Sequence, residues 1–425
     1  MSVINNCLNI KNNEYFVEEY SIKDLTKKYG SPLYIYSKEK IEKKCTLLLN
    51  NFNNKMSNHF QLCYAVKANS NISILKIIKE MGIGADCASA MEIKSALLAG
   101  FNPKKCLFTA VNPTKEDLQE AFDNNLIMNL DDISIWPQVK KLGIPETISF
   151  RVNPGLGAGK FAQIVVGGEG TKFGMNSEKA LLAYKQAKDD GVKKFGLHMM
   201  TGSCILDSDY FLKITSKIIQ ICSHISAELN IDFEFIDIGG GLGIPYEKEE
   251  HILDIESLAK NLSEHYINEC KTNNLKLPKL FMEPGRYLVG DGGILASTVS
   301  QIKVEKQKNF LGLDAGMTTL LRPALYGAYH EIEPIDLSKK GTKKWDVVGP
   351  ICETTDCFAK DRKIGDLNIG DVVIFHDAGA YCFAMSSHFN GRLRPAEVLV
   401  DGKSANIIRK RETFQDEINL QVFSE

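Results

Sequence analysis

Short apolar runs alternate with amphipathic stretches along the first two thirds of the chain. Eight short apolar runs have the length of strands, namely Phe60–Val66, Ile83–Cys87, Cys106–Thr109, Leu126–Leu130, Ile148–Val152, Phe195–Met199, Phe233–Ile238 and Lys279–Met282. Helical spacing separates them, as in Met91–Ala99, Lys115–Asn124, Glu178–Asp190, Tyr210–Leu229 and Ile255–Cys270. A further helix is expected after Ser37, a good N-cap residue. Strict alternation requires a parallel sheet with helical crossovers, so eight units predict an α/β fold with a (β/α)8 TIM-like barrel.

The pattern changes after about residue 286. Strand-like runs joined by turns with Gly and Asp replace the helical spacing, namely Ile294–Val304, Asn309–Leu313, Trp345–Val348, Asp371–Phe375 and Ala396–Val400. Two shorter pieces near the start of the chain, Tyr15–Val17 and Pro32–Tyr36, are also strand-like. The sequence therefore predicts a second, C-terminal β-rich domain, of the β-sandwich or barrel type.

Composition excludes several classes of partner. The 425 residues are 44% hydrophobic and 24% charged, with a formal net charge of −2, so no basic excess indicates nucleic acid or an anionic membrane. The first residues lack a targeting pattern and no apolar run reaches membrane length, so a cytoplasmic protein is expected. Eleven cysteines are spread without metal-binding spacing, and neither a disulfide framework nor a metal site is predicted.

Polar residues and glycines stand at the carboxyl ends of the predicted barrel strands. They are Lys67, Asp86, Arg151, His198, Gly239–Gly241 and Glu283. Active sites of this architecture gather at those ends. We therefore expect these residues to converge on one site.

Lys67 closes the first of the eight strands, in the run Tyr64-Ala65-Val66-Lys67-Ala68-Asn69. An amine held among apolar neighbours is poorly stabilised in its charged form and becomes an imine-forming nucleophile. The alternative is a solvated lysine whose stem covers the end of a strand. Taken alone, the position does not decide between the two.

A glycine run and a carboxylate add two further features. Gly239-Gly240-Gly241 would allow backbone N–H groups to converge on a phosphate, although a plain tight turn is the alternative. Glu283 could keep a proton on a heteroaromatic nitrogen, or could simply pair with Arg286. A lysine, a phosphate cradle and a carboxylate together match the needs of pyridoxal 5'-phosphate.

Sequence motifs along nearly the whole chain carry a family resemblance. They are YAVKAN at 64–69, RVNPGLGAGK at 151–160, TKFGM at 171–175, EPGR at 283–286, LDAGMTTLLRPALYGAYH at 313–330, GPICETTDCFAKDR at 349–362, DAGAYCFAMSS at 377–387 and RPAEVLVDG at 394–402. With these motifs the chain resembles the fold-type III, alanine-racemase-like pyridoxal-phosphate decarboxylases, and among them the diaminopimelate decarboxylases. The resemblance implies a barrel domain over 37–285. It also implies a β-rich domain, built from 1–36 and 286–425, that completes the active site at the interface of a homodimer.

The resemblance also implies roles for individual residues. Lys67 would carry the cofactor covalently and Glu283 would face its ring nitrogen, while Ser203, Gly240, Gly241, Gly285 and Arg286 would hold its phosphate. Arg286, Arg322 and Tyr326 would bind the distal end of the substrate, and Tyr381 would lie against cofactor and substrate. Cys352, as proton donor, and Glu353, as reader of the distal amino group, would come from the partner subunit. The implied reaction converts meso-2,6-diaminopimelate to L-lysine and CO2.

The chain departs from the family pattern at three places. Met200 stands where a histidine usually stacks on the cofactor, Thr354-Thr355 replace the more usual Ser-Gly, and Leu393 replaces proline. A thioether can cover a ring by dispersion but carries no charge. The alternative is therefore a related fold-type III decarboxylase that acts on another basic or carrier-tethered amino acid.

Overall fold

The chain forms two compact units in a computed structural model that describes residues 7–168 and 170–422. Unit 2 comprises Glu42–Ile244 and His251–Leu288, and unit 1 comprises Met1–Ile41, Pro245–Glu250 and Val289–Glu425. Residues 1–6 lie outside the described residues. The prediction that they belong to the β-rich domain, and the expectation that they lack a targeting pattern, therefore stay predictions.

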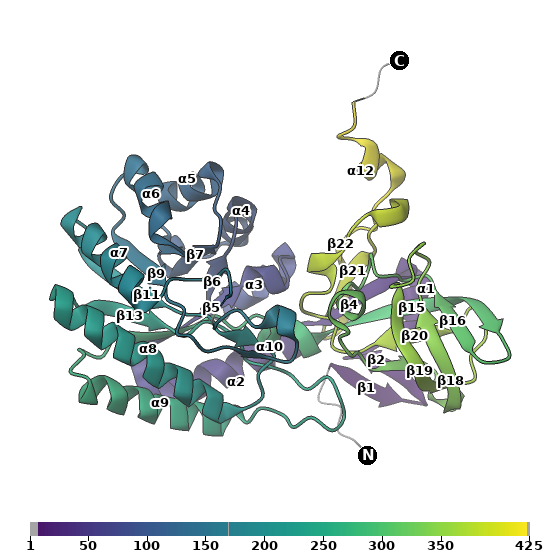
Figure 1. The fold of residues 1–425 in the computed structure, drawn as a ribbon. Coiled ribbons are helices and arrows are strands. Elements are labelled where there is room, and N and C mark those ends of the chain that lie inside the picture. The colour runs from purple at the N-terminus through teal and green to yellow at the C-terminus, as the bar shows by residue number, and fades with distance from the viewer. Residues whose placement is uncertain (1–6, 169, 423–425) are drawn as a thin grey trace. The chain divides into compact units, whose positions relative to one another are not determined.

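Unit 2 is a closed barrel of eight parallel strands, which confirms the predicted fold class (Figure 1). The strands are β5 (Phe60–Ala65), β6 (Gly84–Cys87), β7 (Cys106–Ala110), β8 (Ile127–Leu130), β9 (Thr147–Arg151), β11 (Lys194–His198), β13 (Phe233–Asp237) and β14 (Lys279–Met282). Pairing of Leu280 in β14 with Phe60 in β5 closes the ring.

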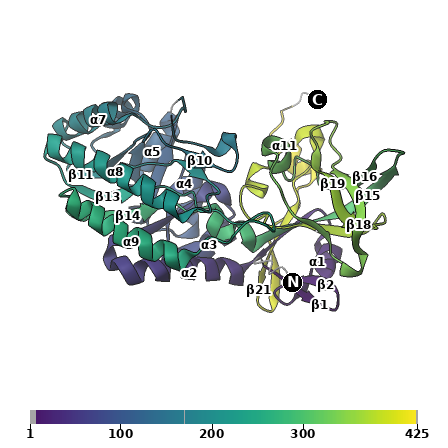
Figure 2. The ribbon, with the colours of Figure 1, turned by 60° about the horizontal axis from the view of Figure 1, so that its bottom comes forward.

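Helices connect successive strands and lie outside the ring, as Figure 2 shows from a second direction. They are α2 (Lys38–Met56), α3 (Ile72–Glu80), α4 (Ala90–Ala99), α5 (Lys115–Asp123), α6 (Trp136–Leu142), α7 (Ser177–Asp189), α8 (Ser208–Leu229) and α9 (Ile255–Thr272). Most begin at a side-chain cap, such as Ser89, which accepts a hydrogen bond from the Glu92 backbone N–H. All helices named above from their spacing are present.

Aromatic side chains fill part of the barrel interior. Phe235 and Phe281 stack with ring centroids 4.4 Å apart. Gly196 makes room for them, because a Cβ at that position would lie 2.0 Å from the Phe235 ring.

Unit 1 is the predicted β-rich region. Its main sheet has nine strands, in the order β19-β18-β16-β15-β4-β21-β22, with β20 joining β15 to β17. Their bounds are β4 (Leu33–Ser37), β15 (Gly293–Val304), β16 (Asn309–Leu313), β17 (Ile332–Pro334), β18 (Lys340–Val348), β19 (Cys357–Gly365), β20 (Val372–Phe375), β21 (Ala396–Asp401) and β22 (Ser404–Arg409). β4 lies between β15 and β21, so a segment from the N-terminal part of the chain is central to this sheet.

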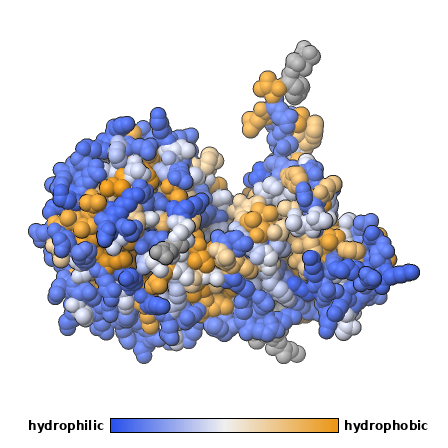
Figure 3. Space-filling model, viewed as in Figure 1, coloured by the Kyte–Doolittle hydropathy of each residue, from blue (hydrophilic) through white to orange (hydrophobic). Residues whose placement is uncertain are grey.

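Smaller elements surround the main sheet of unit 1. They are the three-stranded sheet of β1 (Leu8–Lys11), β2 (Glu14–Val17) and β3 (Tyr20–Ser21), and the helices α1 (Ile22–Tyr29), α11 (Arg322–Tyr326) and α12 (Phe414–Ile418). Helix α12 and the residues after it project from the strands of their unit, where Figure 3 shows exposed hydrophobic groups. In this segment Phe414, Leu420 and Val422 are 72, 94 and 100% exposed.

Within residues 7–168 and 170–422, no helix has both the length and the apolar character needed to cross a bilayer.

Candidate active site

Lys67 lies in a single 3-10 turn, Val66–Ala68, directly after β5. Its Nζ is 2.7 Å from Oδ2 of Asp86, the penultimate residue of the neighbouring strand β6, and Asp86 is fully buried. The Lys67 side chain is 46% exposed. The Lys67 amine therefore lies beside a buried carboxylate and is partly open to solvent.

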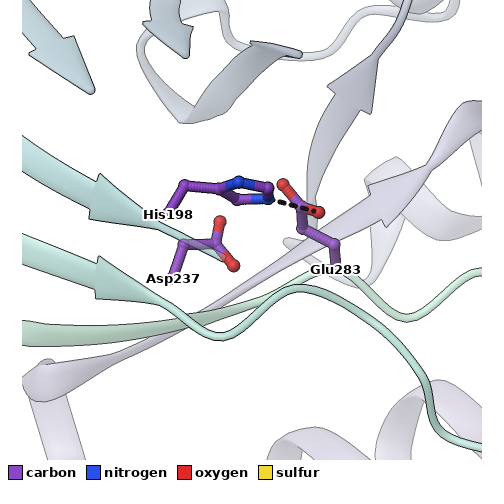
Figure 4. Close-up of side chains that lie close together, drawn as sticks. All are labelled: His198, Asp237 and Glu283. Carbon is purple, nitrogen blue, oxygen red and sulfur yellow. Dashed lines mark hydrogen bonds and ion pairs between the residues drawn. The ribbon is translucent and has the colours of Figure 1, made fainter. Parts of the chain in front are cut away.

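Three buried side chains meet at the carboxyl ends of the next strands (Figure 4). His198, Asp237 and Glu283 end β11, end β13 and follow β14, and each offers a ligand atom within 4.8 Å of the others. His198 Nε2 is 3.3 Å from Glu283 Oε2. The other Glu283 oxygen, Oε1, is buried and has no hydrogen-bond partner among the described residues. A cation would fit such a set by distance, and the predicted lack of a metal site stays a prediction.

The carboxyl groups of this cluster divide into two kinds. Burial, followed by the Glu283 charge, raises the pKa of both Asp86 and Asp237. Burial also acts to raise the pKa of Glu283, but His198, Lys67 and Arg151 outweigh it and hold that pKa below its ordinary value. Glu283 is consequently the carboxyl group of the cluster that stays ionised most readily.

The glycine run forms a tight turn beside this cluster. Gly239 and Gly241 have φ values of +71° and +96°, which favour glycine. The Gly239 N–H donates to Asp237 Oδ1 at 2.8 Å, and the Gly239 carbonyl accepts from the Glu283 N–H at 2.8 Å. A Cβ on Gly240 would lie 2.5 Å from the Glu283 carbonyl oxygen. Backbone hydrogen bonding and close packing therefore fix the glycine turn and Glu283 relative to each other.

Met200 lies against this turn. Its Sδ accepts a hydrogen bond from the Gly240 N–H at 3.2 Å, and a Cβ on Gly239 would lie 2.7 Å from the same sulfur. Arg151, at the end of β9, donates to the Met200 carbonyl at 3.2 Å and lies 3.5 Å from Asp131 Oδ1. The methionine is therefore held both through its backbone and through its sulfur.

Ser203 and Arg286 flank the same part of the barrel. Ser203 belongs to the two-residue strand β12 (Gly202–Ser203), which pairs with β10 (Ala158–Gly159). Arg286, preceded by Gly285, is the first residue of the short helix α10 (Arg286–Val289) and is 6% exposed. Their roles in phosphate or substrate binding stay predictions.

Unit 1 holds a separate cluster around Arg322, the first residue of α11. Arg322 is 1% exposed, and its Nη1 is 2.7 Å from His330 Nε2. Its guanidinium carbon lies 4.4 Å from the centroid of the Tyr246 ring. Tyr326 ends the same helix. Arg322 is therefore a buried cation that is held on two sides.

Cys352 and Glu353 lie on an exposed loop of unit 1. The buried Asp356 shapes this loop, since its carboxylate accepts from the Met317 N–H at 2.6 Å and from the Ile351 N–H at 2.7 Å. The Cys352 N–H donates to Asn390 Oδ1 at 2.7 Å. Tyr381 is half-buried and has a left-handed backbone, with φ of +56°.

Within unit 2 the structure brings together most of the residues that the sequence singles out. Lys67, Glu283 and the glycine turn share one set of strand ends. Sequence reasoning assigned no role to Asp86, Asp237 or His330, although the first two stand at strand ends and the third closes the motif at 313–330. Their position at a strand end or within a motif is the feature of the sequence from which such a role could be predicted.

Comparison with known proteins identifies the family. The family model described as "Pyridoxal-dependent decarboxylase, pyridoxal binding domain" matches residues 38–290. Diaminopimelate decarboxylase from Methanothermobacter thermautotrophicus is 41% identical over 399 residues, which cover 92% of each chain. The chain belongs to the diaminopimelate decarboxylase family. The diaminopimelate decarboxylase of Thermoplasma acidophilum is 39% identical and covers 93% of this chain and 94% of its own.

A solved structure shares the fold of this diaminopimelate decarboxylase family member over nearly its full length. Diaminopimelate decarboxylase from M. jannaschii, in co-complex with L-lysine, superposes with a TM-score of 0.92 at 32% identity, covering 99% of this chain and 98% of that one.

The residues of unit 2 fit the cofactor of the family. The unpartnered Oε1 of the ionised Glu283 suits a protonated ring nitrogen, and Lys67 supplies an amine at the same strand edge. The turn at Gly239–Gly241 places backbone where a Cβ would collide with neighbouring atoms. These observations support a site for pyridoxal phosphate at the carboxyl ends of the barrel strands.

Proposed function

We propose that this protein is a pyridoxal-phosphate-dependent decarboxylase that converts meso-2,6-diaminopimelate to L-lysine and CO2. The observation that carries the proposal is the pairing, at one edge of the barrel, of an accessible lysine amine with an ionised, partly unpartnered Glu283. The 41% identity to a diaminopimelate decarboxylase supports the choice of substrate.

Pyridoxal phosphate supplies an electron sink for the carbon that loses CO2. In the proposal Lys67 would hold the cofactor, and Asp86 would keep the lysine amine oriented. Glu283 would retain a proton on the ring nitrogen. The phosphate would be held by Ser203, Gly240, Gly241, Gly285 and Arg286.

The substrate carries charges that the remaining residues complement. The carboxylate that departs needs no strong partner, whereas the distal carboxylate and amine need fixed charges. We assign the distal carboxylate to Arg286, Arg322 and Tyr326, and the distal amine to Glu353. Tyr381 would lie against cofactor and substrate. Cys352 would return a proton to the reacting carbon.

A homodimer in the cytoplasm is part of the proposal, with the domains 37–285 and 1–36 plus 286–425. Cys352 and Glu353 are exposed on their loop, which supports their action on a partner subunit. The exposed apolar groups of Phe414, Leu420 and Val422 also suit burial against a second copy.

The decisive experiment incubates cofactor-loaded protein with meso-diaminopimelate and measures lysine and CO2. Release of both supports the proposal. No release, with turnover of another diamino acid or a carrier-tethered amino acid from a panel, would favour the related decarboxylase instead. Lys67→Ala should abolish activity, by about a thousand-fold or more, together with the absorbance of bound cofactor. Unchanged absorbance in that variant would contradict the site assignment.

A further inference from the structure

A hydrogen-bonded chain behind Arg322 suggests a role for His330. His330 is 2% exposed, its Nε2 lies 2.7 Å from Arg322 Nη1, and its Nδ1 lies 2.7 Å from the His376 carbonyl oxygen. The Arg362 guanidinium donates to the His330 carbonyl oxygen at 2.9 Å. Both ends of the ring and its backbone are therefore fixed.

These contacts determine the form of the imidazole. A guanidinium can only donate hydrogen bonds, so His330 Nε2 must accept. A carbonyl oxygen can only accept, so His330 Nδ1 must carry the hydrogen. The ring is consequently neutral, with its single hydrogen on Nδ1. A protonated ring would set two cations against each other and would remove the acceptor.

The guanidinium is left ready for an anion. Among the described residues no carboxylate forms an ion pair with Arg322, and its buried Nε has no hydrogen-bond partner. The Tyr246 ring covers its face. A buried cation without an acid partner is costly unless a ligand provides the charge. Nη1 gives one of its two hydrogens to His330 and Nε is enclosed, so Nη2 and the second hydrogen of Nη1 remain for a ligand.

We propose that His330 is a positioning residue that, as a neutral acceptor, orients Arg322 toward the distal carboxylate of the substrate. The inference rests on the proposed function for the identity of that carboxylate. His330 itself touches neither substrate nor cofactor. Its loss should weaken substrate binding while the chemical step continues, because the reacting atoms are held elsewhere.

A matched pair of substitutions tests this role. His330→Gln and His330→Met have similar length and volume, but only glutamine offers an acceptor of comparable strength. His330→Met should raise KM for meso-diaminopimelate, and the Kd for L-lysine, at least about tenfold, with kcat within about threefold of wild type. His330→Gln should restore most of the binding. Equal KM values for His330→Met and wild type would overturn the proposal.

Two controls separate positioning from general damage. His265→Met removes another histidine with a short hydrogen bond, 2.7 Å to Ser216 Oγ, and should leave KM unchanged. In an Arg322→Gln background, His330→Met should add nothing further to KM, because His330 acts through Arg322. A full additional loss in that background would also overturn the proposal.

A measurement on the wild-type protein covers a failure of the methionine variant to fold. Nitrogen-15 spectra of labelled histidines should show His330, assigned by its absence in His330→Gln, as a neutral ring with its hydrogen on Nδ1. A protonated His330 ring, or a hydrogen on Nε2, would overturn the inference. This result needs no substrate, so it stays separate from a wild-type failure to decarboxylate meso-diaminopimelate, which would refute the proposed function instead.

Discussion

Two glutamates, one in each unit, are equally buried and each lies near a histidine, but they differ in how many of their oxygens have a partner. Glu283 and Glu333 are each 5% exposed, and each has a histidine nitrogen within reach, His198 at 3.3 Å and His376 at 3.2 Å. Glu333 is fully used, since it also accepts from the Tyr15 hydroxyl and lies 2.6 Å from Lys340 Nζ. Glu283 keeps one buried oxygen without a partner among the described residues.

The difference separates a carboxylate that stabilises the fold from one that is kept for a ligand. Glu333 ties β2, through Tyr15, to β17 and β18, and so fastens the N-terminal strands to the main sheet of unit 1. An unsatisfied buried oxygen such as that of Glu283 costs stability, and a ligand that carries a donor can recover it. Burial alone therefore does not distinguish Glu283 from Glu333, whereas their hydrogen bonding does.

The largest expected effect comes from Glu283→Gln. An amide keeps the volume but cannot stabilise a positive ring nitrogen, so kcat should fall about a hundred-fold or more. Stability of the cofactor-free protein should fall only slightly, because the lost attraction to His198, Lys67 and Arg151 is largely offset by relief of the repulsion with Asp86 and Asp237 and by the lower cost of burying an amide. Steady-state kinetics and thermal melts measure both. A kcat of Glu283→Gln within threefold of wild type would contradict a role for Glu283 in holding the cofactor.

Glu333→Gln should give the opposite result. It weakens the contacts with Lys340 and His376, so the free energy of unfolding should fall by about 2–3 kcal/mol. The folded variant should keep wild-type kcat, since Glu333 has no part in the proposed site. Chemical denaturation of wild type and variant, with kinetics at a temperature where both are folded, tests this. A large loss of kcat with unchanged stability would contradict it.

The acid dependence of stability should sharpen the same comparison. Burial acts to raise the pKa of Glu333, but His376, Lys340 and Tyr15 outweigh it and lower the pKa to about 2, from an ordinary value of 4.5. A lowered folded-state pKa means stability that is fully present above about pH 4.5 and is lost as the pH falls toward 2. The shift corresponds to about 3 kcal/mol. The difference in free energy of unfolding between wild type and Glu333→Gln should therefore shrink as the pH falls from about 4.5 toward 2. A difference that does not change with pH would contradict the stabilisation of Glu333 by its charged contacts.

The sequence predicts the barrel well and the charge networks poorly. Every predicted barrel strand agrees with the structure within one residue at each end, because buried parallel strands are continuous apolar runs. Three strands of the main sheet in unit 1, β17, β19 and β22, are not predicted by the sequence pattern. Of these, β19 carries the charged run Lys360–Lys363 and lies at one edge of its sheet. The ion pair of Lys67 with Asp86 follows from neighbouring strand ends. The contact of Arg322 with His330 depends on how the chain folds back after α11, which no periodicity encodes.

Substitutions of Met200 should give the smallest effect. They test whether a backbone N–H beside Glu283 also depends on having a hydrogen-bond partner. Its sulfur accepts a hydrogen bond from the Gly240 N–H. In contrast, Glu283 Oε1 has no partner among the described residues. Met200→Leu keeps the apolar volume but removes the acceptor, so the cofactor-free protein should lose about 1 kcal/mol of stability, with kcat changed only a few-fold. Met200→His restores an acceptor and should shift the absorbance of the bound cofactor more than it changes stability. Equal absorbance spectra for the wild type and both variants would place the Met200 side chain away from the cofactor, and its sulfur would then serve only the glycine turn.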